Sequence, residues 1–156
     1  MKKLVLIFSV LVLFNLNLKA QCTPDPQYTE QGVYPDEETG FNSGCADEFY
    51  EQLVTIVVPI DTCVVVVQGF PCINLMYDSV RIVSFQGLPT GLSYVCYDGG
   101  NVVSPSDQCA FEGNTTGCVL ISGTTSLIGT HNLTITVEAY LSGGTTPQAT
   151  QVIDYY

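Results

Sequence analysis

The sequence predicts an all-β fold, a sandwich in which two layers of extended strands share one core. Apolar and polar side chains alternate almost strictly over residues 133–141, as expected of a strand with one buried and one solvated face. Short apolar runs rich in β-branched residues recur along the chain, separated by the glycine, proline, asparagine and aspartate residues typical of turns. No segment has the apolar spacing of an amphipathic helix. Many short strands joined by turns therefore indicate an all-β sandwich in a single copy.

The first twenty residues have the composition of a cleaved signal peptide. Two lysines form a basic start, residues 4–13 form an apolar run, and Ala20 is a small residue at the expected cleavage site. The apolar run is too short to span a bilayer, which disfavours a transmembrane anchor. A lipid anchor on Cys22 would require a small residue directly before it, where Gln21 stands. We therefore expect a secreted or outer-surface protein that does not insert into the membrane after cleavage.

The charge of the cleaved chain excludes several kinds of partner. Three of the four lysine and arginine residues lie before residue 21, so Arg81 alone opposes all 15 acidic residues. The 136 remaining residues carry a formal net charge of −14. Such a charge repels phosphate backbones and anionic lipids, which disfavours nucleic acid and membrane surfaces as partners. Its simplest role is to keep a secreted protein soluble.

The cysteines of an exported chain are expected to form disulfides. No pair has the C-x-x-C spacing of a zinc or redox site. We predict a Cys22–Cys45 bridge that closes the N-terminal extension. A Cys63–Cys72 bridge should clamp a connection between strands. Two of the remaining three cysteines should pair within a long loop, which leaves one free thiol. The seven cysteines are Cys22, Cys45, Cys63, Cys72, Cys96, Cys109 and Cys118.

The first part of the cleaved chain is expected to lead into the domain without forming one. Residues 21–47 are rich in proline, glycine and acidic residues and have no sustained periodicity, which indicates an extended lead-in. The sandwich then occupies residues 48–156. Its first strand, 49–60, alternates with Val54 and Ile56 on one face, and Pro59 marks its end or an edge position.

The other strands follow from short apolar runs between turns. A β-branched run at 63–67 predicts a short strand, and 73–85 predicts one strand bent near Asp78. Pro89 ends the strand before it. The segment 98–117 is longer than most connections, and its cysteines favour an ordered loop. The expected strands, seven or eight in all, are 49–60, 63–67, 73–85, 92–97, 119–121, 131–141 and 148–155.

Three segments in order resemble a known family. They are Leu88-Pro89-x-Gly91-Leu92, Ile121-Ser122-Gly123-Thr124 and Gly129-Thr130-x-x-Leu133-Thr134-Ile135-Thr136-Val137. The stretch from Gly87 to Leu141 resembles the bacterial immunoglobulin-like and cadherin-like repeats of secreted Bacteroidetes proteins, which are often followed by a type IX secretion sorting domain. The resemblance implies an immunoglobulin-like sandwich. Two positions depart from the family pattern, Thr125 in place of proline and His131 in place of tyrosine. The chain ends at Tyr156 without a sorting domain, so that export route rests on analogy.

Few residues suggest a catalytic or binding site. A serine hydrolase would need His131 as its base, and no G-x-S-x-G turn is present, so a structural histidine is favoured. Pairs of carboxylates suited to glycoside hydrolysis arise by chance among fifteen acids. Calcium binding needs six to eight oxygen ligands, and no D-x-D-x-D-G loop occurs. The acids nearest to a calcium site are Asp36, Glu37, Glu38, Asp98 and Asp107. Tyr97 and Phe111, in or beside the long loop, are the best candidates for exposed, ligand-stacking aromatic rings.

These observations favour a noncatalytic extracellular module with an adhesive, structural or spacer role, and no cofactor. Its partner would be an extracellular protein or a glycan. One alternative is a carbohydrate- or calcium-binding accessory domain of a secreted enzyme. Another is a subunit that self-associates into a fibre by strand addition at an uncovered sheet edge.

Overall fold

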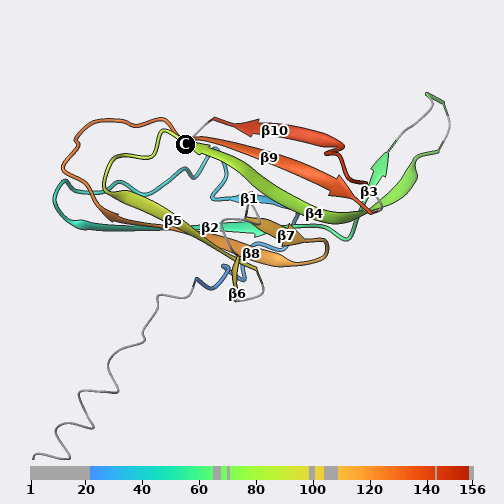
Figure 1. The fold of residues 1–156 in the computed structure, drawn as a ribbon, viewed down its shortest axis with the longest axis horizontal. Coiled ribbons are helices and arrows are strands. Elements are labelled where there is room, and N and C mark those ends of the chain that lie inside the picture. Colours follow the sequence, from blue (N-terminus) through green and yellow to red (C-terminus); the bar gives the residue numbers. More distant parts are fainter. Residues whose placement is uncertain are drawn as a thin grey trace, which may run out of the picture.

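The computed structural model describes residues 22–64, 68–69, 71–98, 101–103, 109–142 and 144–154. Within these ranges the chain forms ten strands and no helix, arranged in two antiparallel sheets (Figure 1), so the all-β prediction is confirmed. The expected signal peptide lies outside the described ranges, and inside them no helix is long and apolar enough to cross a membrane. The strands are β1 (Gly32–Tyr34), β2 (Phe49–Val57), β3 (Asp61–Val64), β4 (Ile73–Gln86), β5 (Leu92–Asp98), β6 (Asn101–Val103), β7 (Ala110–Glu112), β8 (Thr116–Thr124), β9 (Thr134–Leu141) and β10 (Ala149–Ile153).

Sheet 1 contains five strands in the order β1-β2-β8-β5-β6. Its centre is the β2–β8 pair, whose antiparallel register runs unbroken from Phe49↔Thr124 to Val57↔Thr116. Strand β2 ends at Val57, earlier than the expected residue 60. Pro59 has no N–H to donate to a neighbouring strand, and Ile60 is exposed beyond it.

Sheet 2 has the order β10-β9-β4-β3, and β7 also pairs with β4. Strand β4 is the centre of this sheet, because β9 pairs with one of its edges and β3 and β7 pair with the other. Its pairing with β9 is irregular between Tyr77 and Ser79, where the sequence predicts a bend, and again between Ile82 and Ser84. The single long strand expected at 73–85 is therefore present.

The two sheets share one core. Figure 1 shows β10, β9 and β4 along one side of the molecule and β5, β2 and β8 along the other. A single cluster of buried side chains draws on both sheets, so they pack face to face. Period-two alternation selects the buried residues, since only every second side chain of a strand faces inward. The cluster comprises Val54, Ile56, Val58, Ile82, Cys96, Cys109, Phe111, Val119, Ile121, Leu133, Ile135 and Ile153.

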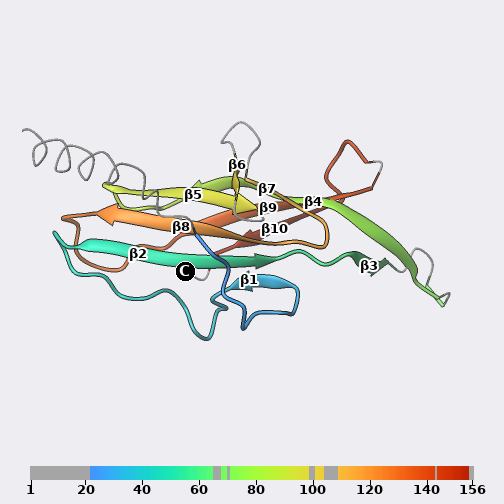
Figure 2. The ribbon, with the colours of Figure 1, turned by 90° about the horizontal axis from the view of Figure 1, so that it is seen from below.

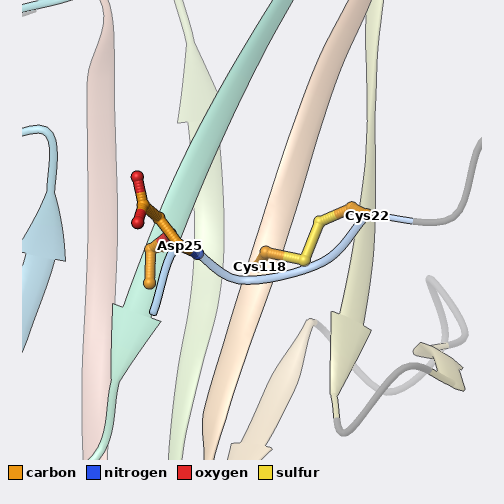
Figure 3. The surroundings of a disulfide bond; sticks show 4 residues. Cys22, Asp25 and Cys118 are labelled. Carbon is orange, nitrogen blue, oxygen red and sulfur yellow. A yellow bond between two sulfur atoms is a disulfide. The ribbon is translucent and has the colours of Figure 1, made fainter. Parts of the chain in front are cut away.

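The N-terminal lead-in is part of the fold. It supplies β1, which pairs with β2 and extends sheet 1. Before β1, residues 22–25 cross the outer face of sheet 1, where Cys22 forms a disulfide with Cys118 (Figure 3). The predicted Cys22–Cys45 pair is therefore wrong, and Cys45 is the free, exposed thiol.

This crossing segment covers a second, smaller cluster of buried residues on sheet 1. The cluster consists of Cys22, Tyr97, Cys118 and Leu120, with Leu53 packed against it. The Asp25 N–H donates to Thr55 Oγ1 at 3.0 Å, which anchors the segment to β2, and Thr55 is fully buried. Sheet 1 thus has apolar contacts on both faces.

The long loop expected at 98–117 contains two short strands. Strand β6 pairs with β5, and β7 crosses to pair with β4 of sheet 2. The Cys96–Cys109 disulfide closes this connection, as the sequence predicts for two of the last three cysteines. Sequence reasoning missed β7 because three residues are too few to show a period.

Candidate binding surfaces

The aromatic residues that the sequence favours for ligand stacking are buried. Phe111 is 0% exposed and Tyr97 is 6% exposed, so their interpretation as exposed rings is wrong. Phe111 points between the sheets and lies against Gly117 of β8, where any side chain would collide with its ring. Tyr97 lies beneath the crossing segment that begins at Cys22. Both rings are buried by segments that are distant in the sequence, so the sequence alone does not show that they are covered.

The candidate calcium ligands do not gather in one place in the described part of the chain. No group of three or more His, Cys, Asp or Glu side chains there is placed to hold a metal ion. Asp36 accepts the Thr39 N–H at 3.0 Å, and the pKa of Asp36 is lowered because the Thr39 side chain and backbone both donate to its carboxylate. Glu37 and Glu38 are exposed beside it. Asp107 lies outside the described residues.

Asp98 is in a different environment, at the end of β5. Its Oδ2 accepts the Glu112 N–H at 3.1 Å and thereby joins β5 to β7. Its Oδ1 is buried and has no hydrogen-bond partner among the described residues. This carboxylate therefore helps to hold the β5–β8 connection in place.

His131 is exposed in the connection before β9, not within a strand as the sequence predicts. The described residues offer it neither a hydrogen bond nor an ion pair. Within the described ranges, the structure thus does not join His131 to a serine and a carboxylate.

A groove of about 580 Å³ lies where the edge strands of the two sheets approach each other. Strand β1 contributes Val33 and Tyr34 to its walls, and β10 contributes Ala149 and Gln151. Tyr77 of β4 also lines the groove and packs against the core. Sequence reasoning could not find the groove, because its walls come from opposite ends of the chain.

The β3–β4 hairpin projects beyond the rest of the molecule (Figure 2). Residues Ile73–Met76 of β4 pair with β3 alone, because the pairing of β4 with β9 starts at Tyr77. The predicted Cys63–Cys72 disulfide is confirmed and closes the hairpin. Ile60, Ile73 and Met76 are each at least half exposed along it. The hairpin is therefore closed by a disulfide, projects from the domain and exposes apolar side chains to solvent.

The outer face of sheet 2 carries a connected group of polar side chains. Arg81 of β4 lies over the ring of Tyr140 of β9, with its Cζ 4.3 Å from the ring centroid. Its Nε donates to Ser79 Oγ at 3.3 Å. The Tyr140 hydroxyl in turn donates to Glu138 Oε2 at 2.7 Å. This bond stabilises the protonated phenol and raises the pKa of Tyr140.

No protein-family model, curated protein or solved structure matches this chain. Its function is therefore argued from its own surfaces. Three are distinct: the groove between β1 and β10, the projecting hairpin, and the face around Arg81. The three disulfides indicate that the chain folds in an oxidising environment of the extracellular type.

Proposed function

We propose that this chain is a noncatalytic immunoglobulin-like module, secreted or held at the outer cell surface, with an adhesive, structural or spacer role. The strand order supports the fold assignment. When β3, β6 and β7 are set aside as insertions, seven strands remain. Labelled A to G in chain order, they form an A-B-E-D sheet (β1-β2-β8-β5) and a G-F-C sheet (β10-β9-β4). This is the arrangement of immunoglobulin constant-type domains.

The observation that carries the adhesive role is the β3–β4 hairpin. Exposed apolar side chains beyond the body of a soluble domain indicate a contact surface for another molecule. Ile73 and Met76 are 53% and 56% exposed, and the Cys63–Cys72 disulfide limits the conformations of the segment that carries them. A surface ordered before binding loses less entropy when it binds.

Surface display tests this role. Bacteria that display residues 21–156 through an unrelated anchor would be allowed to settle on layers of extracellular protein and glycan. We expect more adhesion than with bacteria displaying no chain. The I73S/M76S double variant should return adhesion to that background. Val152→Ser is the matched control, because Val152 is also 56% exposed but lies on β10. Equal adhesion with and without the chain would contradict the adhesive role.

A second candidate function is assembly by strand addition, favoured by the edge strand β10. In the described part of the chain β10 pairs only with β9, so its other edge is open beside the groove. An open edge can pair with an extended segment of another chain. Light scattering over a wide concentration range tests this. Growth into larger species that Gln151→Pro prevents would support assembly, since proline removes an N–H from the strand. A chain that stays monomeric would exclude it.

A further inference from the structure

Arg81 is the only lysine or arginine after residue 20, and it lies on the face of sheet 2 that points away from the core. Its strand neighbours Val80 and Ile82 pack into the core, so the period of two directs Arg81 outward. The corresponding face of sheet 1 is covered by the segment that starts at Cys22. On sheet 2, by contrast, Thr150 and Val152 of β10 are exposed.

The guanidinium group of Arg81 is held in place without an ion pair to any acid of the described residues. Stacking on Tyr140 and the hydrogen bond to Ser79 fix its plane and its Nε. Glu138 lies directly across from Arg81 in the β4–β9 register, yet its carboxylate accepts the Tyr140 hydroxyl. Arg81 forms no ion pair with any residue in the described ranges. With respect to the described residues, this cation thus keeps its terminal N–H groups for another molecule.

We propose that Arg81, supported by Tyr140, binds the carboxylate of an acidic sugar on the outer face of sheet 2. A guanidinium group presents parallel N–H donors that match the two oxygens of a carboxylate. Because stacking already orients this group, little side-chain entropy is lost on binding. The site is separate from the projecting hairpin and does not depend on the adhesive role proposed for it.

The sheet disfavours an extended peptide that would bind at Arg81 by adding a strand. Around Arg81, strand β4 is paired with β9 on one edge and with β7 on the other. An added peptide strand would need free backbone groups, which are absent at this position of the described sheet. The ligand must therefore be recognised by side chains alone. The net charge of −14 on residues 21–156 further disfavours densely charged polyanions. A saccharide in which acidic and neutral units alternate fits both conditions.

Calorimetry on the chain spanning residues 21–156 tests the site. The probe is a tetrasaccharide of alternating glucuronic acid and N-acetylglucosamine, and the neutral control is a tetrasaccharide of N-acetylglucosamine alone. We expect the acidic probe to bind about tenfold more tightly than the neutral one. Arg81→Gln should remove this preference. Arg81→Lys should keep only part of it, because an ammonium group cannot form the paired contact.

Tyr140→Phe gives a result that a simple charge effect would not. It keeps the aromatic ring but releases Glu138, which can then compete for Arg81, so binding should weaken. Glu112→Gln changes the net charge by one unit at an exposed position and should not weaken binding. Equal affinity of the wild-type chain for the two saccharides would overturn the proposal. Competition by inorganic sulfate or by acetyl-triglycine at similar concentration would overturn it too, by showing that any oxyanion or a peptide carboxylate suffices.

Discussion

Cys22 and Cys118 lie 96 residues apart in the chain and are joined across the outer face of sheet 1. Cys118 belongs to β8, the central strand of that sheet, and its sulfur points away from the core formed with sheet 2. The bridge therefore anchors the start of the described chain to the middle of the fold. It also keeps Leu120 and Tyr97 covered.

Removing this bridge should cost much of the stability of the domain. A disulfide that closes a loop of nearly one hundred residues restricts the unfolded chain strongly, and the expected loss in the C22A/C118A double variant is about 4 kcal/mol. Urea unfolding followed by circular dichroism measures it. Limited proteolysis of the same variant should cut within residues 22–30. Cys45→Ala is the control, and its unfolding midpoint should stay near that of the wild type. A double variant as stable as this control would contradict the anchoring role.

Sequence patterns predicted local features well and distant contacts poorly. The alternation over residues 133–141 predicted β9. Cys63 and Cys72, which lie close together in the sequence, were correctly predicted to pair. The partner of Cys22 could not be found in this way. It depends on β8 lying between β2 and β5, an order that arises only when the whole sheet forms.

The candidate sites show the same limit. Phe111 stands in a polar segment without periodicity, and its burial becomes evident only when Gly117 is known to lie against it. Arg81 was visible in the sequence as a lone cation. Its position over Tyr140, however, follows from the irregular register between β4 and β9.

The thiol chemistry provides a second prediction. All seven cysteines lie in the described ranges, and six form the three disulfides. The folded chain should therefore react with one equivalent of iodoacetamide without reductant, at Cys45, because this thiol is exposed. Peptide mapping by mass spectrometry locates the label. Cys45→Ser should take up none, and labelling at Cys22 or Cys118 would show that the Cys22–Cys118 bridge is absent.

A third prediction concerns the contact between Gly117 and Phe111. A methyl group at residue 117 would collide with the Phe111 ring and lie 2.8 Å from the Tyr97 carbonyl oxygen. Since all three residues are buried, Gly117→Ala should destabilise the domain by about 1–3 kcal/mol. Urea unfolding measures the loss.

Combining this change with Phe111→Leu separates the collision from a general loss of packing. Leucine lacks the ring atoms that the new methyl would meet. The G117A/F111L double variant should therefore lose less stability than the sum of the two single changes. Glu112→Ala, at an exposed neighbouring position, should change stability by less than about 0.5 kcal/mol. Strict additivity of the two changes would show that the ring and the new methyl do not meet.

A fourth prediction follows from the bond between Tyr140 and Glu138. The pKa of Tyr140 is raised, first because its hydroxyl donates to the Glu138 carboxylate and then through desolvation and the charge of Glu138. The folded chain thus holds this proton at a pH where the unfolded chain has lost it. The resulting stabilisation is complete below about pH 10, the ordinary pKa of tyrosine, and is lost as the pH rises through the folded-state pKa.

Carbon-13 labelling of the tyrosine ζ carbons allows each ring to be titrated by NMR, with Tyr140→Phe used to assign its signal. Glu138→Ala should lower the pKa of Tyr140 toward the ordinary value, because both the acceptor and the negative charge are removed. Tyr50 serves as an internal control. Its pKa is also raised, but by burial, and its hydroxyl donates to the Asn42 carbonyl, so Glu138→Ala should leave it unchanged. If the two tyrosines shifted together, the change would reflect a loosened fold; if neither shifted, Glu138 would not be the acceptor. A shift confined to Tyr140 is the result expected if Glu138 is held by the phenol and is thereby kept away from Arg81.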